Sequence, residues 1–384
     1  MWLRAETKPQ ETRTPVTPAG VKELIAAGND IVVESAGHHT RRGTPTAPPS
    51  LSPVPGAKLV PAGSWPEAPK ETIILGLKEL PEPASEALVP LKHQHIMFAH
   101  VYKNQTGDKE LLERFEAGGG SIFDLEFLHA PGTTDRIAAF GHMTGYSAAV
   151  LATHVYAQQR IDPHAPLGTI EPYTSESEAK EFLVDLLAKA GVDMPSAHVI
   201  GAHGRCGTGA TRFFNELAEM MGKDKPDLVG WDSAETAAGG PFPEAFTRDI
   251  FLNAVYLPVG VTIPPFITQD MVPSVASSVI VDISCDYTVA DNPMPIYHAS
   301  TSFLEPTLRL REPPAPLDLI AIDHLPAMLP REASAHYAAD LLPYLLALGN
   351  PDSPLHSTWT AAKDLYYANV ERVLGRRSVS APPS

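Results

Sequence analysis

A glycine-rich segment is the part of the sequence whose residue types and spacing most clearly indicate chemistry. It reads Gly201-x-x-Gly204-x-x-Gly207-x-Gly209, follows a short apolar run and precedes a helical pattern, Thr211–Met221. Glycine is needed where the backbone adopts a positive φ or comes close to a ligand. At a junction of strand and helix, such a turn lets the first free N–H groups of the helix hold a pyrophosphate. The spacing departs from the strict G-x-G-x-x-G, so an ordinary strand–helix turn is the alternative.

An acidic residue follows the next apolar run. Asp232 comes directly after Asp227–Trp231, and an acid about 20 residues beyond such glycines commonly binds the adenosine ribose of a dinucleotide. An acid at this place also disfavours a 2′-phosphate, which favours NAD over NADP. The alternative is that Asp232 only caps a following helix. Together, the glycines and this acid predict a site for NAD.

Three apolar runs in the first half of the chain carry titratable side chains near their ends. These are 72–81 with Lys78 and Glu79, 95–100 with His100, and 121–127 with Asp124 and Glu126. Open α/β sheets build their sites at the carboxyl ends of parallel strands, so a series of three indicates a second functional group of residues. For Lys78 alone, a solvated strand end is the alternative; for His100, it is a histidine buried in the core.

Positioning these residues requires alternating strands and helices. A length of 384 residues is typical of two domains. The βαβ alternation on both sides of Gly141 predicts an α/β protein with two doubly wound, Rossmann-like domains that face a central cleft. We expect a substrate or catalytic domain from residues 1–140 with 330–384, and a dinucleotide-binding domain from residues 141–329.

Local signals predict individual elements. Thr17 as N-cap, Pro18 in the first turn and Gly28 beyond the end frame one helix. Further helices are expected over 109–117, 145–158, 331–348 with a kink at Pro343, and 354–374, and one that ends near 190 opens with the capping-box pattern Ser175-x-x-Glu178. Further strands are expected over 31–34, 249–257, 278–286 and 319–326.

One segment has a different composition. Residues 35–56 contain His-His, Arg-Arg and many prolines, which is typical of a surface loop or a mobile lid. His38 and His39 could ligate a metal, but no carboxylate or cysteine follows at ligand spacing, and a solvated pair is the preferred interpretation. We therefore expect no metal site.

The composition limits the classes of partner. A formal charge of −16 argues against nucleic acid, since a phosphate backbone requires a basic face. The sequence contains no apolar run of about 18 residues, so no membrane span is expected. The first residues have no secretory pattern. Two cysteines are too few for a disulfide framework and fit a reducing compartment, so the cytoplasm is expected. The expected partner is a small molecule.

Short runs along nearly the whole chain occur in the order of one known family. They are Leu3–Pro9, Gly76–Glu79, Phe98–Lys103, Asp124–Phe127, Ala138–Gly141, Ile200–Gly207, Gly239–Phe242, Asn292–Tyr297 and Ile322–Ser334. In these runs the chain resembles the NAD-dependent, L-lysine-forming saccharopine dehydrogenases. The resemblance implies oxidative cleavage of saccharopine to L-lysine and 2-oxoglutarate with reduction of NAD, or the reverse reaction, by a monomer.

The resemblance also implies roles for individual residues. Lys78 would take the proton of the secondary amine as hydride leaves, and His100 would be the acid–base group for hydration and collapse of the imine. Arg13 would clamp a substrate carboxylate, with Lys8 as a tuning partner. The other residues implied on the substrate side are Glu79, Glu126, Arg136 and Phe140, and those implied on the cofactor side are Gly201, Gly204, Arg205, Cys206, Gly207, Asp232, Thr236, Tyr256, Asp323 and Leu325.

Elementary chemistry agrees with these roles. A secondary amine is protonated at neutral pH and cannot lose hydride until a base removes that proton, and a lysine can serve only where burial or nearby charge lowers its pKa. A substrate carboxylate suits the fork of an arginine, which binds it bidentately.

Several positions differ from the family pattern. Asp135 precedes Arg136 where two arginines are usual, Val101 replaces a cysteine, and His203 lies inside the glycine loop. The run Gly141–Tyr146 is altered, and the cysteine that pairs with Cys206 in some relatives is missing. These differences leave open a diverged lysine enzyme or a paralogue that uses another pair of amino acid and oxo acid. A non-catalytic NAD-binding protein is the third possibility, against which Lys78 and His100 argue.

Overall fold

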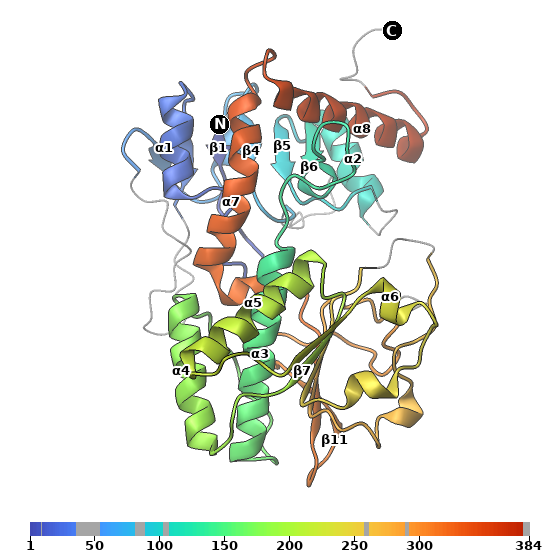
Figure 1. Cartoon of the computed structure of the whole chain (residues 1–384). Helices are drawn as coiled ribbons and strands as arrows, with labels where there is room; N and C mark the ends of the chain where they lie inside the picture. Colours follow the sequence, from blue (N-terminus) through green and yellow to red (C-terminus); the bar gives the residue numbers. More distant parts are fainter. Residues whose placement is uncertain are drawn as a thin grey trace. The chain divides into compact units, whose positions relative to one another are not determined.

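The computed structural model divides into two compact units. It describes residues 1–8, 10–35, 54–80, 89–102, 107–256, 261–288 and 292–378. The first unit is Met1–Ala139 with Ala333–Ser384, and the second is Phe140–Glu332 (Figure 1). Each contains a sheet whose strands are all or mostly parallel, which confirms the predicted α/β class. The roles assigned to the two halves stay predictions. Most of the proline-rich segment, with His38 and His39, lies outside the described residues, as do Pro9 and Lys103 of the matching runs.

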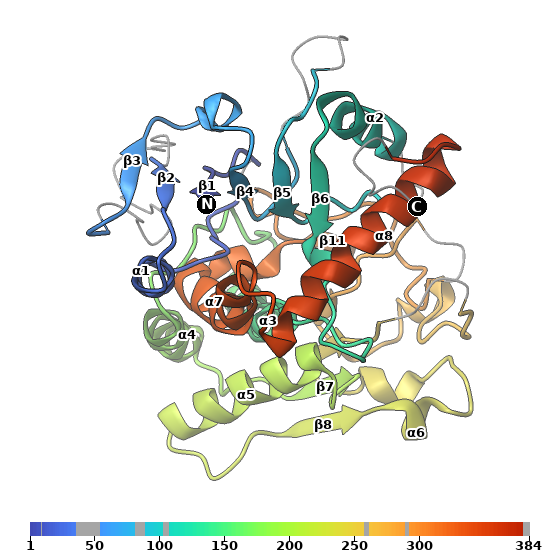
Figure 2. The ribbon, with the colours of Figure 1, turned by 90° about the horizontal axis from the view of Figure 1, so that it is seen from above.

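The first unit has a six-stranded parallel sheet in the order β3-β2-β1-β4-β5-β6, which can be followed in Figure 2. The strands are β1 (Trp2–Leu3), β2 (Val32–Glu34), β3 (Lys58–Val60), β4 (Ile73–Leu75), β5 (Gln94–Met97) and β6 (Ser121–Asp124). The strand order reverses between β1 and β4. This switch point is where open α/β sheets bind their ligands.

The helices of the first unit follow the predicted signals closely. They are α1 (Pro18–Ala26), α2 (Asp108–Gly118), most of α7 (Pro330–Ala347) and α8 (Ser357–Leu374), with short 3₁₀ turns at Trp65–Glu67, Leu125–Phe127 and Pro354–His356. The Thr17 hydroxyl accepts the N–H of Gly20 at 3.2 Å, so the predicted N-cap is confirmed. Pro343 lies inside α7, which continues to Ala347; the kink stays a prediction.

The second unit has the strand order β11-β12-β10-β9-β7-β8, with only β11 antiparallel to its neighbour among the described strands. The strands are β7 (Ala197–Ile200), β8 (Leu228–Trp231), β9 (Ile250–Asn253), β10 (Val279–Asp282), β11 (Leu308–Arg311) and β12 (Leu317–Ile320). The helices are α3 (Gly141–Ile161), α4 (Glu176–Ala190), α5 (Arg205–Met220) and α6 (Ser233–Thr236), with 3₁₀ turns at Pro243–Phe246, Gln269–Met271 and Leu325–Met328.

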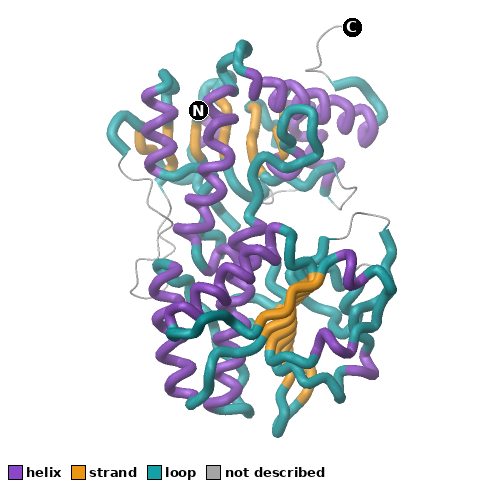
Figure 3. Tube along the Cα trace, in the orientation of Figure 1, coloured by secondary structure: helices purple, strands orange, loops and turns teal. Residues whose placement is uncertain are grey.

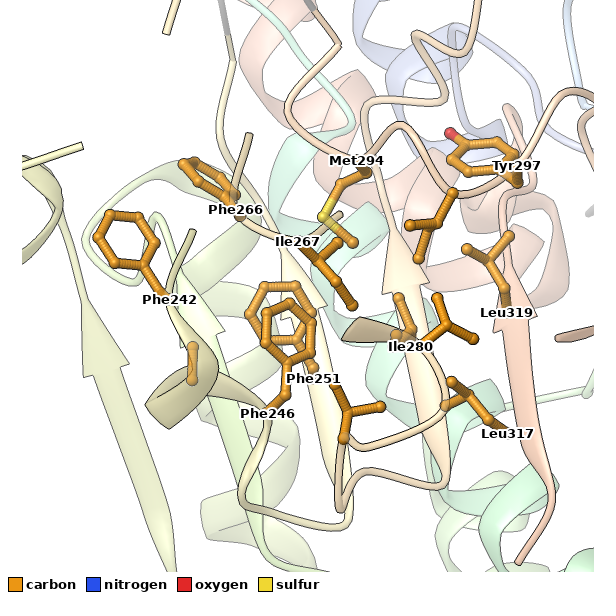
Figure 4. Close-up of a cluster of buried hydrophobic side chains, with 14 of the residues drawn as sticks. Phe242, Phe246, Phe251, Phe266, Ile267, Ile280, Met294, Tyr297, Leu317 and Leu319 are labelled. Carbon is orange, nitrogen blue, oxygen red and sulfur yellow. The ribbon is translucent and has the colours of Figure 1, made fainter. Parts of the chain in front are cut away.

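The two faces of this second sheet are covered differently. The long helices α3, α4 and α5 lie on one face, while loops and short helices cover the other, as Figures 1 and 3 show. On the loop face, side chains such as Phe246, Phe266 and Met294 pack over Phe251 and Ile280 of the strands (Figure 4). The covering segments contain many prolines, which cannot donate the backbone hydrogen bonds of a helix interior. Apolar loop side chains therefore replace the helices that a doubly wound sheet ordinarily has here.

Helix α3 is longer than predicted and almost wholly buried. The sequence indicated residues 145–158, whereas the helix covers Gly141–Ile161. At Gly145, an added Cβ would overlap the Cys206 carbonyl, so the small residue permits α3 and α5 to pack closely. None of the helices in the part of the chain that the structure describes has both the length and the apolar character that crossing a membrane requires.

Candidate active site

Lys78 lies in a loop just after β4, and not inside the longer strand that the sequence predicted. The strand ends at Leu75. Beyond it, the Glu6 carboxylate accepts the backbone N–H groups of Leu77 at 2.6 Å and of Lys78 at 2.9 Å. Burial raises the pKa of Glu6, although the Arg4 guanidinium and these two N–H groups oppose the rise. The loop that carries Lys78 is thus held by a buried carboxyl group.

Arg4 holds the same loop from the other side. Its buried guanidinium donates to the carbonyl of Lys78 and lies 3.8 Å from a carboxylate oxygen of Glu6. A side chain at Gly76 would overlap this guanidinium, because an added Cβ would overlap the Arg4 Nε. The glycine of the Gly-Leu-Lys-Glu run is therefore explained by the space that Arg4 occupies.

Replacing Gly76 by alanine should displace the Arg4 side chain and lower the free energy of unfolding by about 1–3 kcal/mol, the usual cost of overpacking. The measurement is urea denaturation. Gly349→Ala is the matched control in the same unit, because an added Cβ there meets nothing within 4 Å among the described atoms. Equal stability of the two variants would contradict this account of Gly76.

His100 stands between two carboxylates. Its Nδ1 lies 2.6 Å from Oε2 of Glu126, and its Nε2 lies 3.4 Å from Oε1 of Glu79. The ring stacks on Phe98 with a centroid distance of 5.9 Å. The residue has a φ of +56°, which is uncommon for a side-chain-bearing residue and is found preferentially at functional sites. Glu79 and Glu126, which the family resemblance implied on the substrate side, thus lie beside the His100 ring.

Asp124 joins the ends of β5 and β6. Its Oδ1 accepts the N–H of Ala99 at 3.3 Å and the N–H of Glu126 at 3.0 Å. Burial raises the pKa of Asp124 to about 6. The sequence placed this residue in a matching run but assigned no role to it.

Arg13 is buried and already binds a carboxylate of its own chain. Its Nε and Nη2 donate to the two oxygens of Glu11 at 2.8 and 2.7 Å. Burial opposes ionisation of Glu11, but Arg13 outweighs it, so the pKa of Glu11 is lowered. A substrate carboxylate would compete with Glu11 for this edge of the guanidinium. Lys8 lies 3.6 Å from Glu79, at the partly exposed rim of the group.

Of the remaining residues predicted on the substrate side, Arg136 lies near the end of the first unit's N-terminal segment and Phe140 is the first residue of the second unit. Arg136 pairs with His129 in an isolated antiparallel bridge, and Asp135 lies in the exposed turn between them, where its N–H donates to the Thr133 hydroxyl at 3.1 Å. Phe140 directly precedes α3. The structure gives no contact that explains Asp135 in place of arginine.

The glycine loop follows β7, as predicted, but α5 begins at Arg205 and not at Thr211, so Gly207 and Gly209 lie in its first turns. The glycines differ in what requires them. Gly201 has a φ of +87°, and an added Cβ would lie 2.7 Å from the Ala254 carbonyl oxygen. At Gly207, a Cβ would overlap the Gly201 carbonyl. At Gly204, the N-cap of α5, an added Cβ would meet only the Gly201 oxygen, at 3.3 Å, among the atoms that the structure describes, and φ is −71°. Internal packing thus explains Gly201 and Gly207 but not Gly204, where the backbone is open to a ligand.

Asp232 fits both interpretations made from the sequence. Its Oδ1 accepts the N–H of Ser233 at 2.9 Å, and with Glu235 it forms a capping box on α6. Its Oδ2 accepts the N–H of His203, in the glycine loop, at 3.0 Å. The N–H of His203, which has the larger influence, and the N–H of Ser233 lower the pKa of Asp232. The carboxylate therefore stands at the end of β8 beside the glycine loop, where a ribose would be expected.

The other residues predicted on the cofactor side vary in exposure. Arg205 and Asp323 are exposed, and Tyr256 is 77 % exposed beyond the end of β9. The Thr236 hydroxyl donates to the Asp232 carbonyl at 2.9 Å. Leu325 is fully buried, so its side chain belongs to the core and only its backbone could meet a ligand. Their roles toward a cofactor stay predictions.

A buried carboxyl group at the end of β10 was missed by the sequence analysis. Asp282 accepts from Asn253 at 3.0 Å, from the Ser284 hydroxyl at 2.8 Å and from the Tyr297 hydroxyl at 2.7 Å. Burial raises the pKa of Asp282, although these donors oppose the rise. The network fixes the carboxyl ends of β9 and β10. Two of its donors, Asn253 and Tyr297, come from other segments of the chain, so the spacing of residues around Asp282 could not indicate the network.

Solved structures of low sequence identity share the fold. An L-alanine dehydrogenase matches with a TM-score of 0.64 and 19 % identity, over 98 % of this chain and 99 % of that chain. A transhydrogenase from Sinorhizobium meliloti matches with a TM-score of 0.51 and 17 % identity, over 91 % and 94 %. The family model "Alanine dehydrogenase/PNT, N-terminal domain" matches residues 2–147.

Relatives of much higher identity identify the family. The chain is 40 % identical to saccharopine dehydrogenase [NAD(+), L-lysine-forming] of Schizosaccharomyces pombe, with 97 % of this chain and 99 % of the relative covered. It is 41 % identical to the protein of that name from Candida albicans, with 97 % of each covered, and 42 % identical to the one from Neurospora crassa, with 96 % and 95 % covered. These matches confirm the resemblance predicted from the short runs. The chain therefore belongs to the family of NAD-dependent, L-lysine-forming saccharopine dehydrogenases.

Proposed function

We propose that this protein is an NAD-dependent oxidoreductase that cleaves saccharopine to L-lysine and 2-oxoglutarate and also catalyses the reverse reductive amination. About 40 % identity over 97 % of the chain supports this proposal. The observation that carries it is that Lys78 and His100 each follow, by three residues, the end of one of two neighbouring parallel strands, β4 and β5, of which β4 borders the switch point of the first sheet.

The proposed chemistry begins with a proton. The Lys78 amine takes the proton from the secondary amine of the substrate, so that the nitrogen lone pair can form the C=N bond. A bound NAD would supply the acceptor for the hydride that leaves the adjacent carbon. His100 then moves protons as one water molecule adds to the imine carbon and the C–N bond breaks, which leaves the amine of L-lysine and the keto group of 2-oxoglutarate. Glu79 and Glu126 hold the imidazole ring in place through its two nitrogens.

The second unit supplies residues that fit a dinucleotide. The open backbone at Gly204 and the first N–H groups of α5 would hold the pyrophosphate. Asp232, with its lowered pKa, would accept hydrogen bonds from ribose hydroxyl groups and would repel a 2′-phosphate. We therefore propose NAD, and not NADP, as the cofactor.

An anionic substrate requires local basic residues in a chain whose formal charge is −16. We propose that Arg13, Lys8 and Arg136 provide them. The burial of Arg13 supports this role, because a guanidinium removed from water binds a carboxylate more strongly than an exposed one.

The decisive experiment follows NADH formation from saccharopine with NAD and, separately, with NADP. The proposal predicts turnover with NAD and little with NADP. If saccharopine fails, NADH oxidation is measured across a panel of amino acids and oxo acids; activity with another pair would replace the lysine assignment while leaving the imine chemistry. NAD binding in calorimetry without turnover of any pair would indicate a non-catalytic protein.

We further propose that the protein is a cytoplasmic monomer. A content of two cysteines in 384 residues supports a reducing compartment. Sedimentation equilibrium tests the monomer, and fractionation of the source cells tests the compartment.

A further inference from the structure

Asp124 occupies a buried position between β5 and β6, the two strands that lead to His100 and Glu126. It is the last residue of β6, is 2 % exposed, and lies opposite Met97 of β5 in the parallel register. Its Oδ1 accepts the N–H of Ala99, which precedes His100, and the N–H of Glu126. One oxygen atom thus fixes the backbone of Ala99, next to His100, and the backbone of Glu126.

The second oxygen has a different environment. Within the described part of the chain, Oδ2 of Asp124 is buried and has no hydrogen-bond partner. The titratable groups that interact with this carboxyl are His100, Glu126, Tyr102 and, from α7, Tyr337. An incompletely bonded buried carboxyl costs free energy of folding, and the Oδ1 contacts alone would be served equally well by an uncharged amide. The charge of Asp124 therefore requires a separate explanation.

We propose that Asp124 is a positioning residue for the His100–Glu126 pair: through Oδ1 it fixes the backbone of Glu126 and of Ala99, the residue before His100, and through the charge of its carboxyl group it is coupled to both side chains. Burial, the largest influence, raises the pKa of Asp124 to about 6; the charge of His100 lowers it and that of Glu126 raises it. A change of charge at any one of the three groups is therefore felt by the others. The consequence for catalysis rests on the function proposed above, whereas the coupling itself does not.

The coupling is tested without cofactor or substrate, by carbon-13 NMR of the side-chain carboxyl groups, with Asp124→Asn to assign the signal. The carboxyl of Asp124 should titrate near its pKa of about 6. His100→Gln removes the group whose interaction lowers this pKa, so the midpoint should rise. Glu126→Gln removes the negative charge that raises it, so the midpoint should fall. His164→Gln, at an exposed position outside this group, should leave it unchanged. Midpoints that do not move in the first two variants would overturn the coupling.

The positioning role is tested by kinetics with two substitutions. Asp124→Ala removes both Oδ1 contacts and should lower kcat about 10- to 100-fold, the effect of a misplaced catalytic group, with KM for NAD unchanged within about twofold. Asp124→Asn keeps an acceptor at Oδ1 and should recover most of kcat below pH 6, where Asp124 is itself uncharged, but should lack the change of activity that follows ionisation of Asp124 at higher pH. Urea unfolding of both variants accompanies the assay.

The two proposals fail in different ways. If both variants lose activity only in proportion to their unfolded fraction, or if neither alters kcat or its pH profile, Asp124 has no positioning role. If the unmodified protein does not turn over saccharopine but Asp124 responds to His100 and Glu126 in the NMR titration, the coupling holds and the proposed substrate is wrong.

Discussion

Replacing Lys78 by methionine is expected to lower kcat for saccharopine oxidation by about 10²- to 10⁴-fold, the range typical of a lost general base. Methionine preserves most of the side-chain length and apolar contact but has no nitrogen to take the proton of the substrate amine. The loop should keep its shape, because Glu6 and Arg4 hold the backbone of Lys78 and not its side chain. KM for NAD should therefore change little. The measurement is steady-state NADH formation over a range of pH.

Lys58→Met is the matched control. Lys58 is exposed on β3, the edge strand of the same sheet, and outside the group of residues around His100. It should leave kcat and KM unchanged. A Lys78→Met variant as active as the Lys58→Met variant would remove Lys78 from the mechanism, even if the protein proved to be a saccharopine dehydrogenase.

The sequence predicted the alternating framework well but placed the ends of strands too late. Lys78 was expected on a strand over 72–81, whereas β4 ends at Leu75. An apolar run cannot show where the backbone hydrogen bonds between strands end and another partner replaces them. Here that partner is the carboxylate of Glu6, more than 70 residues earlier in the chain. The two-residue strand β1 was missed for a related reason: it is too short to show a period, although it pairs with both β2 and β4.

The site residues predicted from the sequence are those that we propose to carry chemistry, and the missed residues are those that hold them in position. Lys78, His100, Glu79 and Glu126 could be named from strand ends and family motifs. The roles of Glu6, Glu11 and Asp124 could not, because each depends on backbone N–H groups or a guanidinium brought close only by folding. A carboxylate near the end of an apolar run has the same sequence pattern whether it is solvated or buried.

The glycine loop offers the second large expected effect, because its glycines are required for different reasons. Replacing Gly207 by alanine would place a Cβ against the Gly201 carbonyl and the Ala202 backbone, neither of which can move as a flexible side chain could. We expect a loss of about 3 kcal/mol or more in the free energy of unfolding, at the upper end of overpacking costs. NAD affinity should fall as well, because the first turn of α5 is displaced.

The Gly204→Ala variant tests NAD binding separately from the stability of the fold. Position 204 has a φ of −71°, and within the described part of the chain an added Cβ meets only the Gly201 oxygen, at 3.3 Å. The free energy of unfolding should therefore stay within about 1 kcal/mol of the original. If a pyrophosphate lies against this backbone, the same methyl group should weaken NAD binding at least about tenfold in calorimetry, since a close backbone approach is what glycine permits. A Gly204→Ala protein that binds NAD normally would leave the loop as a plain turn between β7 and α5. Glycines that serve only packing affect stability first, whereas a glycine that serves a ligand affects binding alone, and the comparison of Gly207 with Gly204 measures that difference within one loop.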